Sequence, residues 1–215
     1  MALTKVTSGL IADNSVGLDQ LDGGTDGNLI TFDASGNPSH VATGSANQVL
    51  TSNGAGAAPT FQSIVGNQVV QHVFATDATY ASTTSTFPLD DTIPQSSEGA
   101  EAVTVAITPT NSSNYLLIEA GGMYTNSNSS TSVTLAIFQD STANAIAVNG
   151  FAVSSGSNPN SGTITHRMAA GTTSSTTFKL RFGGQSGTSY RNGISSNRLY
   201  GGTVNSWIMV TELKA

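Results

Sequence analysis

The second part of the chain consists of short segments in which apolar and polar residues alternate, and this period of two constrains the fold most strongly. In STTFKLRFGG, the apolar Phe178, Leu180 and Phe182 fall on one side. The basic Lys179 and Arg181 fall on the other. Because successive side chains of a β-strand point to opposite faces, this alternation is typical of a half-buried strand. The sequence therefore predicts β-structure in this region.

About eight such segments follow one another from about Gly66 to the C-terminus, separated by Ser, Thr, Gly and Asn. No stretch has helical periodicity of useful length. NYLLIEAGG is apolar on both faces, as expected of a central strand, and NAIAVNGFAV predicts two short strands around an Asn149-Gly150 turn. Strand number and spacing predict an all-β fold with a β-sandwich of the jelly-roll type, and the region is long enough to bury a core.

A two-fold repeat precedes this region. GNLITFDASGNPSHV (27–41) and NQVLTSNGAGAAPTFQ (47–62) share a short predicted strand, a turn rich in Gly and Asn, and a return strand after Pro38 or Pro59. Each unit holds few apolar residues, and an isolated two-stranded hairpin is marginal in water. Stacked repeats usually need three or more units, so we expect other chains to supply the missing neighbours. The expected organisation is an N-terminal segment 1–21, a hairpin repeat 22–65 and a sandwich domain 66–215.

Composition excludes several classes of protein. The net charge of −6 argues against nucleic acid as the main partner, and the absence of cysteine excludes disulfides and thiolate metal sites. No apolar run approaches the ~18 residues of a membrane span, so no membrane insertion is expected. The opening residues lack the apolar core of a secretory signal. Six of the seven basic residues lie in residues 161–215, where they form solvated loops, pair across subunits or make a basic surface.

The sequence holds none of the common catalytic motifs. It lacks a phosphate-binding loop, a GxSxG elbow and an HExxH helix. Asp90 and Asp91 are adjacent and would point to opposite faces of a strand, so they do not form the carboxylate pair of a glycosidase. His166 alternates with apolar residues and is interpreted as a core or interface histidine. We therefore expect no enzyme activity, no catalytic residue, no cofactor and no metal.

One loop has the composition of a contact surface. Tyr190, Arg191, Arg198 and Tyr200 surround the Asn192-Gly193 pair between two predicted strands. Arg and Tyr are common anchors of protein interfaces. The loop is either a tip that contacts a receptor or a surface that packs against a neighbouring subunit.

Three zones of the chain resemble phage tail-fibre and virion-fibre proteins, particularly those of marine and cyanobacterial phages. MALTKVTSGLIADNSVGLDQLD resembles their opening segment, and GTDGNLITFDASGNPSHVATGSANQVLTSNGAGAAPTFQ resembles their shaft repeats. FPLDDTIPQSSEGAEAVTVAITPTNSSNYLLIEAGG, LAIFQDSTANAIA and HRMAAGTTSSTTFKLRFGG resemble a recurrent C-terminal domain of these fibres.

The resemblance implies a homotrimer on the virion surface. The N-terminal segment would dock on another virion protein. A hairpin shaft would follow, and a jelly-roll head like those of tumour necrosis factor and C1q would bind a glycan or protein of the host surface. Attachment to the tail and attachment to the capsid, as a head fibre or decoration protein, are both open. A tailspike-like polysaccharide depolymerase is the less favoured alternative, because the chain is too short for an extended β-helix.

Overall fold

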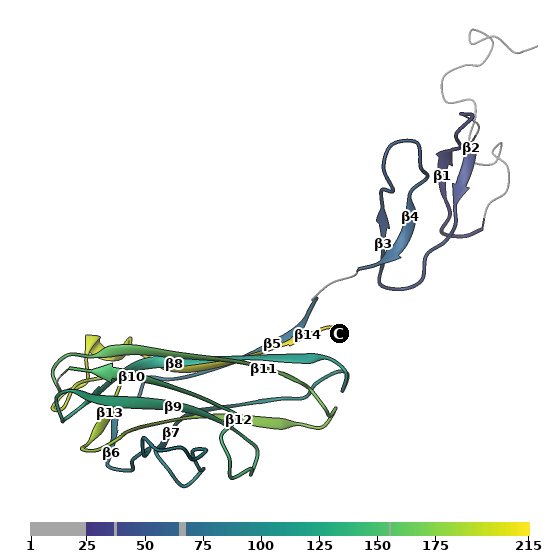
Figure 1. Ribbon diagram of the computed structural model, residues 1–215. Coiled ribbons are helices and arrows are strands. Elements are labelled where there is room, and N and C mark those ends of the chain that lie inside the picture. Colours follow the sequence, from purple (N-terminus) through teal and green to yellow (C-terminus); the bar gives the residue numbers. More distant parts are fainter. Residues whose placement is uncertain (1–24, 37, 65–67, 155) are drawn as a thin grey trace, which may run out of the picture. The chain divides into compact units, whose positions relative to one another are not determined.

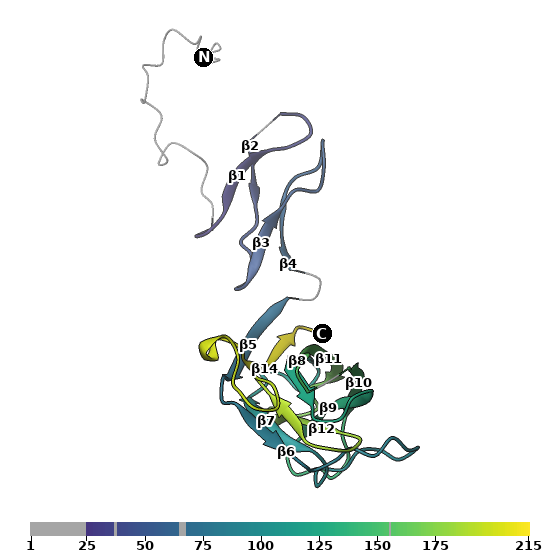
Figure 2. The same cartoon turned by 90° about the vertical axis from the view of Figure 1, so that its left-hand side faces the viewer.

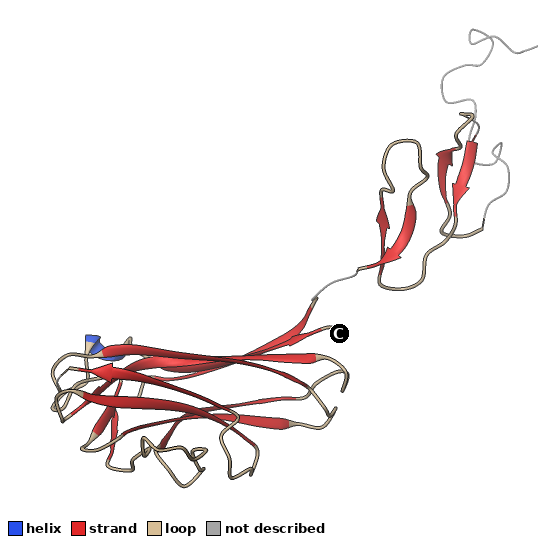
Figure 3. Cartoon of the chain, viewed as in Figure 1, coloured by secondary structure: helices blue, strands red, loops and turns tan. Residues whose placement is uncertain are grey.

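The computed structural model describes residues 25–36, 38–64, 68–154 and 156–215. The chain divides into two compact units, Met1–Val65 and Gly66–Ala215. The expected docking segment 1–21 lies outside the described residues. Nearly all regular structure in the described residues is β-strand, with one short 3₁₀ turn, η2 (Tyr200–Gly202) (Figure 3). The predicted all-β fold is therefore confirmed.

The first unit contains the two expected hairpins (Figure 1). Strand β1 (Leu29–Phe32) pairs with β2 (Pro38–Val41), and β3 (Gln48–Thr51) pairs with β4 (Thr60–Ser63), both antiparallel. In the first turn, the Asp33 carboxylate accepts a hydrogen bond from the Ser35 amide at 2.8 Å, and Gly36 adopts a φ of 78°. A positive φ costs glycine little, so the sequence sets the turn where it was predicted.

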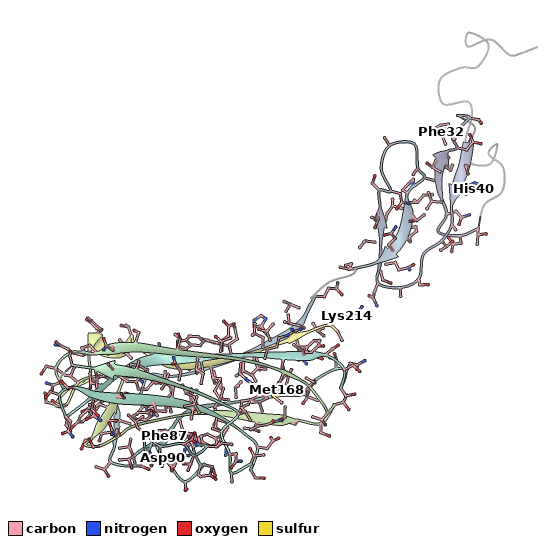
Figure 4. All side chains as sticks on the ribbon, in the orientation of Figure 1. Phe32, His40, Phe87, Asp90, Met168 and Lys214 are labelled. Atoms are coloured by element: carbon pink, nitrogen blue, oxygen red, sulfur yellow. The ribbon has the colours of Figure 1, made fainter. Side chains whose placement is uncertain are left out.

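Apolar side chains of these hairpins remain largely uncovered within one chain. Val41 is buried, but Ile30, Phe32 and Leu50 are exposed by 51%, 66% and 47%. Figure 4 labels Phe32 and His40 on the first hairpin. The second hairpin has the same character: Val49 is 44% exposed. Two hairpins alone therefore leave much of their apolar surface in water.

The second unit is a sandwich of two antiparallel sheets, seen as two layers in Figure 1. The four-stranded sheet has the order β10-β9-β12-β7, and the six-stranded sheet has the path β5-β14-β8-β13-β6 with β11 on the other edge of β8. The strands are β5 (Val69–Asp77), β6 (Ala81–Thr83), β7 (Ala100–Ile107), β8 (Tyr115–Asn126), β9 (Thr131–Gln139), β10 (Ala147–Val153), β11 (Asn160–Ala169), β12 (Thr176–Gly184), β13 (Ser189–Arg191) and β14 (Ser206–Leu213).

The strand order is that of a jelly roll. Eight of the sandwich strands have seven or more residues, namely β5, β7, β8, β9, β10, β11, β12 and β14. Numbered 1 to 8 in chain order, they form one sheet in the order 1-8-3-6 and the other in the order 5-4-7-2. Each sheet thus interleaves early and late strands, as a jelly roll does. The predicted sandwich type is confirmed.

The core lies between the two sheets and follows the alternation in the sequence. Phe178, Leu180 and Phe182 of β12 are at most 1% exposed, as predicted. Leu116 and Ile118 of β8 are fully buried opposite them. The predicted Asn149-Gly150 turn is wrong, because both residues lie inside the continuous strand β10, where they pair with β9. Asn149 donates a side-chain hydrogen bond to the Thr163 carbonyl at 2.6 Å, which ties it to β11 instead of a turn.

A loop between β6 and β7 covers part of the outer side of the four-stranded sheet. Phe87 of this loop is fully buried and packs with Ala136 and Phe138 of β9 in a second small core (Figure 4). Gly99 makes this approach possible, because a Cβ atom there would overlap the Phe87 ring. The loop is therefore a fixed part of the domain surface.

Candidate functional site

The outer side of the six-stranded sheet carries a group of apolar side chains. On β14, on β5 from Val70 and on β8 up to Ala120, every second residue points into the core, and the residues between them point outward. Phe74 is 58% exposed, Val70 is 40% exposed and Tyr115 is 36% exposed. We call the following set the outer apolar face: Val70, Phe74, Tyr115, Leu117, Trp207 and Met209.

The strand register places Phe74, Met209 and Trp207 of this set next to one another. Met209 pairs with Phe74 on β5, and Trp207 pairs with Gly121 on β8. The Phe74 and Trp207 rings lie 6.5 Å apart between centroids. Since Gly121 has no side chain, Trp207 lies over the strand, and a Cβ atom at Gly121 would stand 3.2 Å from the indole. Phe74 and Trp207 thus form an aromatic pair on this face, and Met209 lies beside it.

Two charged residues share this side of the sheet. Glu119 pairs with Met209 on β14 and with Thr165 on β11, so it lies in the middle of the patch. The Arg167 guanidinium lies over the Tyr115 ring, 3.9 Å from its centroid. This cation–π contact holds the Arg167 charge at the edge of the outer apolar face, while the aliphatic part of the side chain covers apolar surface.

The structure places the four residues of the predicted contact loop in different environments. Tyr190 packs at the base of the loop. This residue lies on β13, and its ring stacks on Tyr80 with 6.3 Å between centroids and 5° between planes. The Tyr80 hydroxyl donates to the Ile194 carbonyl at 3.0 Å. Burial of Tyr80, with a smaller effect of Tyr190, raises the Tyr80 pKa. The pair fixes the base of the loop.

Arg191 is a buried structural residue, which corrects its proposed role as a receptor contact. It is 6% exposed, and its guanidinium donates to the Asp77 carboxylate and to the Ala102 carbonyl, both at 2.7 Å. Burial raises the Asp77 pKa, but hydrogen bonds from Thr79 and Arg191 outweigh it and lower the pKa to about 2. The sequence does not predict this ion pair, because Asp77 and Arg191 lie 114 residues apart in the chain.

Arg198 and Tyr200 do reach the surface. Arg198 is exposed and bridges back to Gly193, and Tyr200 is 69% exposed. Tyr200 has a φ of 48°, an unusual conformation for a bulky residue. Of the four predicted contact residues, these two remain available to a partner, and a receptor role for them stays a prediction.

A buried carboxylate on β14 was not anticipated. Glu212 is fully buried and accepts hydrogen bonds from the Gln71 and Asn114 side chains, each at 2.6 Å. The Thr110 amide and hydroxyl donate to it at 2.9 and 2.8 Å. Burial raises the Glu212 pKa, but the bonds from Asn114, Gln71 and Thr110 together lower it to about 2. This network ties β14 and β5 to the loop after β7.

The described part of the chain contains neither a metal-binding cluster nor a helix that could cross a membrane. Among those residues, no cluster of three or more His, Cys, Asp or Glu is arranged to hold a metal ion. None of the helical segments described there is long and apolar enough to cross a membrane. The carboxylates with lowered pKa are Asp77, Asp90 and Glu212, and each accepts hydrogen bonds within the domain.

The profile of the Pgp3 C-terminal domain family matches residues 85–215, which is more than half of the chain. The chain belongs to this family. The Pgp3 match begins in the loop that carries Phe87 and runs to the end of β14, so it includes seven of the eight long sandwich strands but not β5. No curated protein matches the chain. The identification as a phage fibre stays a prediction.

Several solved structures are similar at low identity. Latent PorU of Porphyromonas gingivalis is 10% identical with a TM-score of 0.34, over 74% of this chain and 15% of PorU. The infectious bursal disease virus Gt strain structure is 10% identical with a TM-score of 0.32, over 83% of this chain and 44% of that chain. The VP2 subviral particle of the same virus is 13% identical with a TM-score of 0.30, over 82% and 44%. The chain thus spans less than half of these proteins, and none of these likenesses bears on function.

Proposed function

We propose that this protein is a structural, non-enzymatic subunit of a homotrimeric virion fibre that attaches to a host surface. The observation that carries the proposal is the outer apolar face of the six-stranded sheet. Soluble monomers rarely expose a contiguous apolar patch of more than a few hundred Å². Phe74, Trp207 and Met209 lie side by side on this face, and in the proposed assembly another chain covers them.

Closed symmetry explains why the same chain would supply the cover. Three copies around one axis can each place this face against the next, and the assembly then closes without forming a filament. Burying one large apolar side chain contributes roughly 1.5–3 kcal/mol, so even part of the face would hold the copies together. The hairpins support the same assembly, since Ile30, Phe32 and Leu50 are left exposed in one chain.

The attachment role follows from the resemblance to fibres and from the loops of the sandwich. A trimer presents three copies of each exposed loop, including Arg198 and Tyr200, and simultaneous contacts raise the overall affinity. Both tail and capsid attachment are compatible with this role. A segment at the N-terminus would dock on another virion protein.

The test is the oligomeric state of the wild-type protein and two variants by sedimentation equilibrium. We expect a trimer for the wild type and dissociation for Phe74→Ser, because the new hydroxyl would be buried in the contact. Leu89→Ser is the matched control, since Leu89 is 57% exposed, nearly the same as Phe74 at 58%, but lies in the loop after β6. A folded wild-type monomer, or equal behaviour of the two variants, would overturn the assembly.

The location of the protein is tested separately. A reconstruction of the particle, or labelling with an antibody against the sandwich domain, should place three copies at each fibre position on the virion surface. Absence from purified particles would refute the virion role, whatever the oligomeric state. Release of oligosaccharides from host polysaccharide by the pure protein would refute the non-enzymatic part.

A further inference from the structure

A small polar hollow lies on the opposite sheet, away from the outer apolar face. Strand β12 supplies Lys179 and Arg181, which point away from the core as the sequence predicted. The hollow has a volume of about 190 Å³, which is large enough for a single small ligand group. Its lining consists of Ser96, Phe138, Asp140, Ser141, Thr142, Lys179 and Arg181.

The walls of the hollow are held by backbone hydrogen bonds. The Ser96 amide donates to the Ala143 carbonyl at 2.7 Å, and the Ala145 amide donates to the Pro94 carbonyl at 2.9 Å. These bonds fasten the loop before β7 to the turn after β9. Arg181 adds two bonds, from Nε to the Glu98 carbonyl at 2.9 Å and from Nη2 to the Gly99 carbonyl at 2.8 Å. The hollow is therefore preformed, as small-molecule sites usually are.

The cationic groups in the hollow have unused donors. Within the described residues, the Lys179 ammonium makes no hydrogen bond or ion pair, and Arg181 uses Nε and Nη2 but not Nη1. Glu101 lies opposite Arg181 on β7, but its carboxylate accepts from the Thr104 hydroxyl at 2.8 Å and forms no ion pair with Arg181. The Lys179 ammonium and the Arg181 Nη1 thus have donors available for an anionic ligand.

The Asp140 carboxylate in the lining restricts which anionic ligands the hollow could bind. Its carboxylate accepts hydrogen bonds from the Thr176 hydroxyl at 2.9 Å and from the Thr177 amide at 2.7 Å, and it keeps lone pairs for further donors. A bare anion such as sulfate would be repelled by this charge and could not use the acceptor. A sugar that carries a carboxylate offers both an anion for Lys179 and hydroxyl donors for Asp140.

We propose that this hollow binds the carboxylated sugar residue of an acidic polysaccharide. Lys179 and Arg181 would receive the sugar carboxylate, while Asp140 and the hydroxyls of Ser141 and Thr142 would bind the ring hydroxyls. This inference rests on the proposed attachment role and names its ligand class. It uses a different face from the one that assembles the trimer, so three hollows would remain open in the assembly.

The experiment measures binding to the full chain by ligand-observed NMR at low salt. The probes are a trisaccharide of galacturonic acid, the corresponding uncharged galactose trisaccharide and inorganic sulfate. We expect binding of the acidic trisaccharide alone. Lys179→Gln should weaken it about tenfold or more, since a charge-assisted bond is lost, without changing the fold. Lys214→Gln is the control, because it removes the same charge from an exposed position beside the C-terminus (Figure 4).

Each other outcome contradicts the proposal. The proposed site would be refuted if the acidic trisaccharide did not bind, or if it bound equally to Lys179→Gln and to the wild type. Sulfate binding as tight as the sugar would reduce it to a general anion site and overturn the sugar assignment. If the protein is a trimer on the virion but does not bind the sugar, only this inference is refuted. If the protein binds the sugar but is a monomer, only the proposed trimer is refuted.

Discussion

Replacement of Glu212 by Gln tests the claim that a buried carboxylate stabilises the sandwich. The substitution keeps the shape of the side chain but removes its charge and turns one acceptor oxygen into a donor. The new amide would then face donors at Gln71, Thr110 and Asn114, which now bind the carboxylate. The fold should survive, because the apolar core is untouched, but with a lower free energy of unfolding.

The size of the loss follows from the Glu212 pKa. It falls from an ordinary value of 4.5 to about 2 in the folded chain. At about 1.4 kcal/mol per pKa unit, the ionised carboxylate contributes about 3 kcal/mol. Since the folded pKa is the lower one, this contribution is complete above pH 4.5 and is lost as the pH falls towards 2. The variant should therefore lose about 3 kcal/mol at pH 7 and much less at pH 2.

The measurement is urea unfolding of wild type and Glu212→Gln between pH 2 and pH 7, at one protein concentration because assembly adds to apparent stability. Asp91→Asn is a control, since Asp91 is exposed. Some pH dependence should remain in the variant, because the Asp77 pKa is also lowered to about 2. If the difference between wild type and variant is the same at all pH values, the carboxylate does not act through its ionisation and the reasoning fails.

Two further substitutions test the core and the buried ion pair. Leu180→Ala, at a fully buried position of β12, should cost about 2–5 kcal/mol in urea unfolding, and a cost below 1 kcal/mol would show that the core is loosely packed there. Arg191→Ala leaves Asp77 without its cation, so stability should fall by about 2 kcal/mol and the Asp77 pKa, followed by NMR titration, should rise. An unchanged Asp77 titration would contradict the pairing.

The elements that the sequence predicts are those with local causes. Phe178, Leu180 and Phe182 alternate with Lys179 and Arg181, and a strand must place these two groups on opposite faces. The hairpin turns follow from Gly36 and the prolines in the same way. The register of one strand against another, and with it the jelly-roll order, was expected only as a class, because it depends on pairs far apart in the chain.

The features that the sequence did not predict depend on such distant pairs. In SWIMVTEL, Glu212 occupies an inward position and looks like an error in the alternation. Its partner Gln71 is 141 residues away, and Asn114 is 98 residues away. The composition of its loop predicts Arg191 at the surface, but the ion pair with Asp77 holds its side chain inside the domain. The predicted turn at Asn149-Gly150 was wrong for the opposite reason, because pairing with the neighbouring strands outweighed a strong local preference for a turn.

The pairing of β5 with β14 has a mechanical consequence for a tethered head. The chain enters the sandwich through β5, and Figures 1 and 2 show β14 beside it. The two strands pair along eight residues of β14, and the Lys214 amide donates to the Gln68 carbonyl at 2.9 Å. In the proposed fibre, a pull on the entering chain, with the far end of the head held by a bound cell, would act along these strands. It would therefore load their hydrogen bonds in shear, all at once, and not one after another as in unzipping.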